Sequence, residues 1–368
     1  MRVWTSRENR RRLRLYDIAI VGLGPAGANF ARLIDTNKYR VAAIDKKTTT
    51  PGSFAKPCGG LLAPDAQKAL AKLNLPLPGE VLVSPQIFYV KTIDVDNGLQ
   101  RNYQRFYINI NRHKFDFWLL SLIPKTVDVF PGSSVIRINK EDELYSIVFA
   151  RDGKTQAIRT KYVIGADGAN GIVSKTFLAK REGCLKLAAQ EWYEQGEGNP
   201  FFLCIFDSEN PDSYSWFLPK GDCFIFGGAY EKGEARSSFE RQKLNLRRYG
   251  ITLGKPIKRE ACFLYRLKGP GDFHLGKDRI LMLGEAAGFI SPSSYEGISG
   301  ALESSYLLSA LFNHQADTDI LKRYKRATSN LRAKYTLKIL KSNVLNNRHL
   351  RKLIMKSGLQ SMEVTDQG

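Results

Sequence analysis

The sequence predicts a mixed α/β fold, in which a Rossmann-like parallel sheet is interrupted by an inserted antiparallel sheet and followed by C-terminal helices. Three observations carry this prediction. An apolar strand runs into a glycine-rich turn and a helix near the N-terminus, aromatic extended segments fill residues 184–268, and apolar residues recur every three or four positions after residue 319. The 368 residues exceed one typical domain, so we expect two that are intimately joined.

The first unit is β-α-β. We expect a strand over residues 16–21, a helix over 25–34 and a second strand over 41–44 that ends in Asp45. Further along, residues 81–110 are β-rich, residues 112–121 favour a helix, and more strands lead to 162–164.

The motif Gly22-Leu-Gly24-Pro-Ala-Gly27 joins the first strand to the helix. Gly22 allows a tight turn, Gly24 lets the backbone approach a pyrophosphate, and Gly27 lets the helix pack on the strand. The helix N-terminus offers free N–H groups to phosphates, and Asp45 can accept hydrogen bonds from ribose hydroxyls. The unit therefore predicts dinucleotide binding.

The second half alternates sheet and helix. Residues 184–268 indicate an antiparallel sheet with one helix over 236–248, a buried strand follows at 279–283, and a long helix is expected over 294–312. A last helical region begins near residue 319, with an apolar stripe that we expect to pack on the nucleotide-binding part. These expectations give three regions: a discontinuous nucleotide-binding domain (1–80, 104–183 and 269–316), an antiparallel-sheet substrate domain (81–103 and 184–268) and a basic C-terminal helical region (317–368).

Charge is concentrated at the two ends of the chain. The net charge is +20, and residues 1–14 hold six arginines and one glutamate, while residues 322–356 hold twelve lysines and arginines and no acid. The chain shows no nucleic-acid-reading motif, so we expect no nucleic-acid partner. Two interpretations of the basic C-terminus stay open: a solvated face, or a surface that binds an anionic membrane.

The cysteines and the apolar segments indicate in which cellular compartment the protein is expected. The five cysteines are scattered and form no CxxC pair. This pattern indicates neither a disulfide framework nor a metal site. Arg10-Arg11-Arg12 precedes too short an apolar run for a signal peptide, and no run of eighteen apolar residues occurs. We expect a cytoplasmic protein, with peripheral association at the inner face of the membrane as the alternative.

Three later segments carry a specific resemblance. Gly165-Ala-Asp167-Gly168 follows one strand, Gly284-Glu285-Ala-Ala-Gly288 follows another and precedes Gly297-Ile298, and Arg112 opens a helix. These segments resemble the signatures of FAD-dependent hydroxylases of the p-hydroxybenzoate hydroxylase fold. The resemblance covers about residues 16–310 and implies FAD as the cofactor. The family normally has Asp where this chain has Glu285, one methylene longer, in the contact with the ribityl chain.

Two more segments resemble the geranylgeranyl reductase family. Lys56-Pro-Cys58-Gly59-Gly60 resembles its K-x-C-G-G element beside the flavin. Tyr214-Ser-Trp216-Phe-Leu-Pro219, followed by Gly227-Gly228, resembles its Y-x-W-x-F-P…G-G element along the substrate cavity, with Leu218 in place of the usual aromatic residue. Phrases such as Phe224-Ile-Phe-Gly-Gly-Ala-Tyr230 are similar to the CbrA-like flavoproteins, which share the Glu of the third signature.

Together these patterns define the expected site. The predicted cofactor-binding residues are Gly22, Gly24, Gly27, Ala28, Asp45, Cys58, Gly59, Gly60, Arg112, Asp167, Glu285, Gly288, Gly297 and Ile298. The predicted substrate-binding residues are Tyr214, Trp216, Pro219, Gly227 and Gly228.

Each chemical role has a structural alternative. Cys58 either relays a proton or tunes the flavin, as the candidate catalytic residue, or it is a small residue packed against the ring. Tyr214 and Trp216 alternate along one strand and so face the same side, where they either wall an isoprenoid channel or form plain sheet core. The four histidines have no ligand spacing and are read as structural or surface residues.

The resemblance implies a flavin-dependent reductase of C=C bonds in a prenyl or polyprenyl lipid, which needs a hydride donor, a proton donor and a dry cavity. A flavin-dependent monooxygenase or halogenase of the same fold is the second hypothesis, and a non-catalytic flavin-bound lipid-binding protein is the third. With one nucleotide fingerprint, the electron donor is either NAD(P)H that docks transiently or a ferredoxin-like protein.

Overall fold

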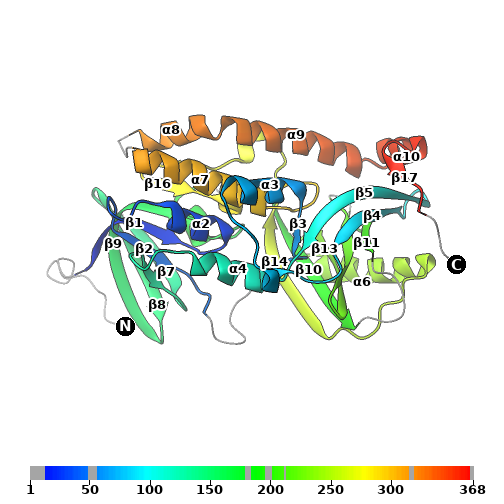
Figure 1. Ribbon diagram of the computed structural model, residues 1–368, viewed down its shortest axis with the longest axis horizontal. Coiled ribbons are helices and arrows are strands. Elements are labelled where there is room, and N and C mark those ends of the chain that lie inside the picture. Colours follow the sequence, from blue (N-terminus) through cyan, green and yellow to red (C-terminus); the bar gives the residue numbers. More distant parts are fainter. Residues whose placement is uncertain are drawn as a thin grey trace.

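Two sheets and a layer of helices build the molecule (Figure 1). The computed structural model describes residues 13–48, 56–178, 184–194, 201–210, 213–314 and 319–364. The basic residues 1–12 of the sequence analysis lie outside these ranges. The expected mixed α/β fold is confirmed, with a Rossmann-like sheet and a second, largely antiparallel sheet.

The first sheet has the strand order β15-β16-β9-β1-β2-β6, with β7 and β8 joined to β9 as an antiparallel extension. β1 pairs in parallel with β2 and β9, and β16 pairs in parallel with β9. These strands are almost fully buried because helices cover the sheet, which explains their continuous apolar runs. The strand bounds are β1 Leu15–Val21, β2 Val41–Ile44, β6 Asp128–Phe130, β7 Ser134–Glu141, β8 Leu144–Arg151, β9 Lys154–Gly165, β15 Gly276–Lys277 and β16 Ile280–Met282.

The second sheet has the strand order β14-β10-β13-β12-β11-β4-β5-β17. It is antiparallel except where β11 runs parallel to β4, a pairing between distant segments that local sequence does not reveal. β5 extends through the domain boundary that we expected between residues 103 and 104, so residues 104–109 belong to this sheet. The bounds are β3 Leu61–Leu62, β4 Ile87–Asp94, β5 Leu99–Asn109, β10 Leu185–Glu194, β11 Phe202–Phe206, β12 Ser215–Lys220, β13 Cys223–Tyr230, β14 Lys258–Tyr265 and β17 Ser361–Met362.

Helices cover both sheets. In Figure 1, α8 and α9 run along the top of the molecule from the first sheet toward the second, and α10 lies at the end beside β17. The helix bounds are α2 Pro25–Leu33, α3 Pro64–Lys72, α4 Arg112–Ser121, α5 Ile172–Phe177, α6 Ala235–Leu246, α7 Ile298–His314, α8 Ile320–Ala327, α9 Ser329–Asn346 and α10 Arg348–Ser357. Among the helices that the structure describes, none is both long and apolar enough to cross a bilayer.

Two helix expectations have clear outcomes. The apolar stripe of the C-terminal region is confirmed as a packing face, because Tyr324, Leu331, Tyr335 and Ile339 are buried in the core of the first sheet. The helix expected from residue 294 begins only at Ile298. Tyr295 has a φ of 53°, a left-handed backbone conformation that a helix excludes, so residues 291–297 form a turn instead.

Candidate functional site

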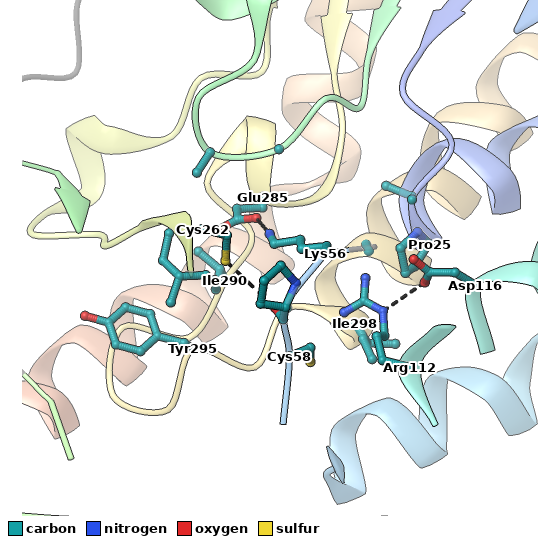
Figure 2. Close-up of a pocket in the computed structure, with 18 of the residues that line it drawn as sticks. Pro25, Lys56, Cys58, Arg112, Asp116, Cys262, Glu285, Ile290, Tyr295 and Ile298 are labelled. Atoms are coloured by element: carbon teal, nitrogen blue, oxygen red, sulfur yellow. Dashed lines mark hydrogen bonds and ion pairs between the residues drawn. The ribbon is translucent and has the colours of Figure 1, made fainter. Parts of the chain in front are cut away.

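One large cavity lies where the glycine turn after β1 meets the second sheet. Its volume is about 630 Å³, within the usual range of cofactor and substrate sites. Segments distant in sequence line it, among them the turn after β1, residues 56–61, the start of α4, and the turn before α7 (Figure 2). The cavity therefore gathers the motifs that the sequence singled out.

The glycine turn has the geometry that its motif requires. Gly22 has a φ of 94°, and a Cβ there would lie 2.6 Å from the carbonyl oxygen of Ala166. A Cβ on Gly27 would lie 1.9 Å from the oxygen of Gly22, so helix and strand pack in direct backbone contact. A Cβ on Gly24 would meet nothing within 4 Å, which leaves open space before the first turn of α2. That space and the N–H groups of α2 fit a pyrophosphate.

Asp45 lies at the end of β2 and contacts the same turn. Its carboxylate accepts hydrogen bonds from the backbone N–H of Leu23 and, at 2.6 Å, from that of Lys47. Asp45 also lines the cavity, where its remaining lone pairs fit a ribose hydroxyl. The residue thus holds the glycine turn against β2 as well as facing the cavity.

A buried charge cluster lies beside the turn. Lys47 pairs with Asp116 at 3.0 Å, and Nε of Arg112 donates to Asp116 at 2.8 Å. Burial alone would raise the pKa of Asp116, but the two cations outweigh it and lower that pKa. Asn111 caps the helix by accepting from the N–H of Lys114 at 3.0 Å, which fixes Arg112 as the first residue of α4 at the cavity wall.

Glu285 has protein partners in this structure. One oxygen pairs with Lys56, and the other accepts from the N–H of Tyr265 at 3.1 Å (Figure 2). Glu285 also lies beside Gly168, where a Cβ would be 3.7 Å from its carboxylate. The pair therefore brings three sequence segments together: the loop with Lys56, the Gly-Ala-Asp-Gly turn and the turn after β16.

Cys58 lies on the cavity wall near Arg112 (Figure 2). Its sulfur accepts a weak contact from the N–H of Gly60 at 3.4 Å and interacts with the Arg112 guanidinium. Cys262 also lines the cavity and contacts the oxygen of Pro57 at 3.8 Å. Burial raises the pKa of Cys262 to about 11, so this thiol stays protonated at neutral pH.

Aromatic side chains line the other end of the cavity. They come from Tyr107, Phe202, Tyr214 and Trp216, with Leu218 beside them. Tyr214 and Trp216 pack in the same cluster, as their alternation along the strand predicted. This end is apolar and joins the glycine-lined end without interruption.

Most of the predicted site residues line this cavity. Those that do are Gly22, Gly24, Asp45, Cys58, Gly59, Gly60, Arg112, Asp167, Glu285, Gly297, Ile298, Tyr214 and Trp216.

Six predicted residues do not line it: Gly27, Ala28, Gly288, Pro219, Gly227 and Gly228. Ala28 is buried in the core below α2. Gly227 lies opposite Trp216 across β12 and β13, where a Cβ would come within 2.6 Å of the indole. Gly227 therefore affects the cavity only indirectly, by leaving room for the Trp216 side chain that lines it.

The sequence analysis missed Glu296. This carboxyl lines the aromatic end of the cavity, where burial raises its pKa. An acid directly before Gly297-Ile298, in a turn between two apolar segments, was the available signal.

Comparisons with known proteins agree with this fold. No protein-family model matches the chain. The chain is 45% identical over 346 residues, 94% of each chain, to Protein CbrA of Shigella flexneri serotype 5b (strain 8401). Its fold matches that of a geranylgeranyl bacteriochlorophyll reductase-like protein from Thermoplasma acidophilum, with a TM-score of 0.77 at 17% identity over 96% of this chain and 94% of that one. It also matches CmlS, a flavin-dependent halogenase, with a TM-score of 0.68 at 16% identity over 96% and 69%.

Proposed function

Because the chain belongs to the CbrA family and has the fold of FAD-dependent oxidoreductases, we propose that it binds FAD and reduces C=C bonds of a prenyl or polyprenyl lipid. One observation carries the proposal. A single cavity has a dinucleotide-type glycine turn at one end and an aromatic, apolar wall at the other. A nucleotide cofactor and an apolar chain can therefore meet inside it.

The residues at the glycine end would hold the cofactor. The N-terminus of α2 and Gly24 would face the pyrophosphate, and Asp45 would accept a hydrogen bond from the ribose. Arg112 and the pair of Lys56 with Glu285 would present charge and hydrogen-bond donors to the flavin part of the cofactor. When bound and reduced, FAD supplies a hydride.

The aromatic end would hold the substrate. Tyr214, Trp216 and Phe202 exclude water and present flat apolar surfaces to an isoprenoid chain. Water exclusion matters because it keeps the reduced cofactor from side reactions and strengthens electrostatic contacts with the alkene. The electron donor, NAD(P)H or a ferredoxin-like protein, would act before the lipid is reduced.

A lipid substrate also calls for contact with a membrane, and the outer face of the C-terminal helices is our candidate. Leu337, Leu340 and Val344 are exposed along one face of α9, together with Lys341. On α10, Leu350 and Leu353 are exposed beside the exposed Lys352. Exposed leucines among lysines suit the surface of an anionic bilayer, where apolar side chains enter the boundary and cations contact head groups.

Anaerobic photoreduction tests the activity directly. The FAD-loaded protein is reduced by light without oxygen, mixed with prenyl lipids, and the lipids are analysed by mass spectrometry. The proposal expects a gain of two mass units per reduced bond, with no gain in the dark or with heat-denatured protein. NADPH oxidation that requires oxygen and an aromatic substrate would favour the monooxygenase or halogenase, whose fold is shared. Bound flavin without turnover on any lipid would favour the non-catalytic protein.

A further inference from the structure

Glu296 is a carboxyl group placed in an apolar part of the cavity. It lies in the turn directly before Gly297 and Ile298, which line the cavity beside the glycine end. Tyr295, its neighbour in the chain, has a φ of 53°, a conformation that bulky side chains rarely adopt. Such outliers persist where the surrounding structure fixes the chain, and they cluster at functional sites. The turn thus holds Glu296 at the cavity wall, beside Tyr107 and Tyr214.

Removal from water, rather than the groups that face it, favours the protonated form of Glu296. The Tyr107 hydroxyl on β5 interacts with its carboxyl, and Tyr214 lies close by. Lys338 and Lys341 of α9 and Asp65 of α3 also face it, but Lys338 already pairs with Asp65 at 2.7 Å. Among the described cations, none lies within ion-pairing distance of Glu296. Burial raises the pKa of Glu296, and neither the lysines nor Tyr107 offset it.

We propose that Glu296 is the catalytic acid that protonates the substrate alkene, and this inference rests on the proposed prenyl reductase activity. Glu296 would give a proton to one alkene carbon, and the hydride for the other carbon would come from the reduced FAD held at the glycine end. The Glu296 O–H bond breaks, its electron pair stays on the carboxylate, and the π electrons of the alkene form the new C–H bond. The alkene is reduced by two electrons, the flavin is oxidised by two, and the carboxylate regains its proton from water.

The first test needs no turnover. An acid whose pKa is raised in the folded protein binds its proton more tightly there than in the unfolded chain, where the reference pKa is 4.5. Its stabilising contribution is therefore complete below that value and is lost as pH rises through the higher folded pKa. Glu296→Gln removes this dependence. We expect the Tm of Glu296→Gln relative to wild type to rise steadily with pH.

Glu303→Gln is the matched control for the stability test. It is the same substitution seven residues along, outside the cavity, where Glu303 pairs with Lys334 at 3.3 Å. Its Tm difference from wild type should not rise with pH. A Tm difference for Glu296→Gln that is flat with pH would mean that Glu296 is ionised in the folded protein, which overturns the proposal.

The second test uses single turnovers of photoreduced enzyme with a reducible prenyl lipid. The wild-type rate should fall as pH rises through the pKa of Glu296, since a general acid acts in its protonated form. Glu296→Gln should lower the rate by roughly 100-fold or more and abolish this alkaline limb, with FAD content unchanged. Tyr107→Phe should move the limb to higher pH, because the interaction with the Tyr107 hydroxyl lowers the pKa of Glu296.

The outcomes separate the two proposals. A Glu296→Gln enzyme that reduces the lipid at the wild-type rate and with the wild-type pH profile overturns the role of Glu296 and leaves the reductase standing. Wild-type protein that reduces no prenyl lipid overturns the reductase, and the assignment of Glu296 as its acid with it.

Discussion

At the scale of single residues, charged side chains of the cavity pair across segments that lie far apart in the sequence, as Lys47 does with Asp116 and Lys56 with Glu285. Asp45 was predicted from its place after a strand, and Arg112 and Glu285 from the resemblance of their segments to flavoprotein signatures. All three line the cavity. Glu285 was expected to contact the ribityl chain, and in the structure it pairs with Lys56, which lies 229 positions earlier. Contacts over such separations depend on how two sheets come together, which local patterns do not encode.

Asp45 gives the sharpest residue-scale prediction. Asp45→Arg removes the acceptor for the ribose and for the N–H of Leu23, and it places a cation beside the glycine turn. We expect the purified variant to lose most of its flavin, because a hydrogen bond to a charged group contributes about 1.5–3 kcal/mol, or roughly 10–150-fold in affinity. Flavin absorbance per protein measures this. Asp17→Arg, on the partly exposed start of β1, is the control, and equal flavin content in both variants would contradict the role of Asp45.

At the scale of elements, the alternation of side chains along a strand predicted which face they share, but it did not predict which strands pair or in what register. Alternation correctly placed Tyr214 and Trp216 on one face. The pairing of β12 with β13, which sets Gly227 opposite Trp216, depends on the turn between the strands and could not be read from either strand alone. The parallel pair of β4 and β11 was missed for a related reason, since over 100 residues separate the two strands.

Gly227 tests that register. In Gly227→Ala, the new Cβ would lie 2.6 Å from the Trp216 indole and 2.8 Å from Cβ of Gln190. Overpacking of this kind usually costs about 1–3 kcal/mol, so the urea midpoint should fall and Trp216 should shift at the cavity wall. Gly233→Ala is matched, because a Cβ there meets nothing within 4 Å. If both variants unfold at the same urea concentration, the cross-strand contact is absent.

At the scale of the whole molecule, the C-terminal helices join the two sheets. α9 packs its buried face on the core of the first sheet, and Arg351 of α10 reaches the second. Arg351 donates to Asp94 at 2.8 and 3.0 Å and to Asp96 at 2.9 Å, with Asp94 fully buried. The sequence showed that this region is basic, but a charge count does not distinguish lysines that pair with an acid from lysines that face solvent. Lys334 and Lys338 in fact pair with Asp65.

Arg351→Leu should therefore loosen this junction. It leaves Asp94 buried without its cation, and breaking a buried pair costs about 3–5 kcal/mol. The free energy of unfolding from a urea titration should fall by that amount. Lys352→Ala, one position along on the exposed face, should change it by less than about 0.5 kcal/mol. Similar values for the two variants would show that the pair contributes little.

Liposome binding tests the membrane proposal for the same helices. Binding should require anionic lipid and fall as the Debye length shortens from about 10 Å at 0.1 M salt to about 3 Å at 1 M. Leu337→Ser with Leu353→Ser should weaken binding without changing FAD content, since both side chains are 66% exposed. Charge reversal at Lys341 should act in the same direction. If the protein does not bind anionic vesicles even at low salt, the membrane proposal is wrong and the basic C-terminal region is a solvated face.

The two-residue strand β17 has a further consequence, for self-association. β5 is the outermost long strand of its sheet, and among the described residues its outer side pairs with β3 at one end and β17 at the other. An open strand edge offers free N–H and C=O groups to any other extended chain, which is a common start of aggregation. β17 covers part of that edge at Asn102 and Tyr103. Detaching it should leave the fold intact while turning β5 into a template on which copies of the protein can stack.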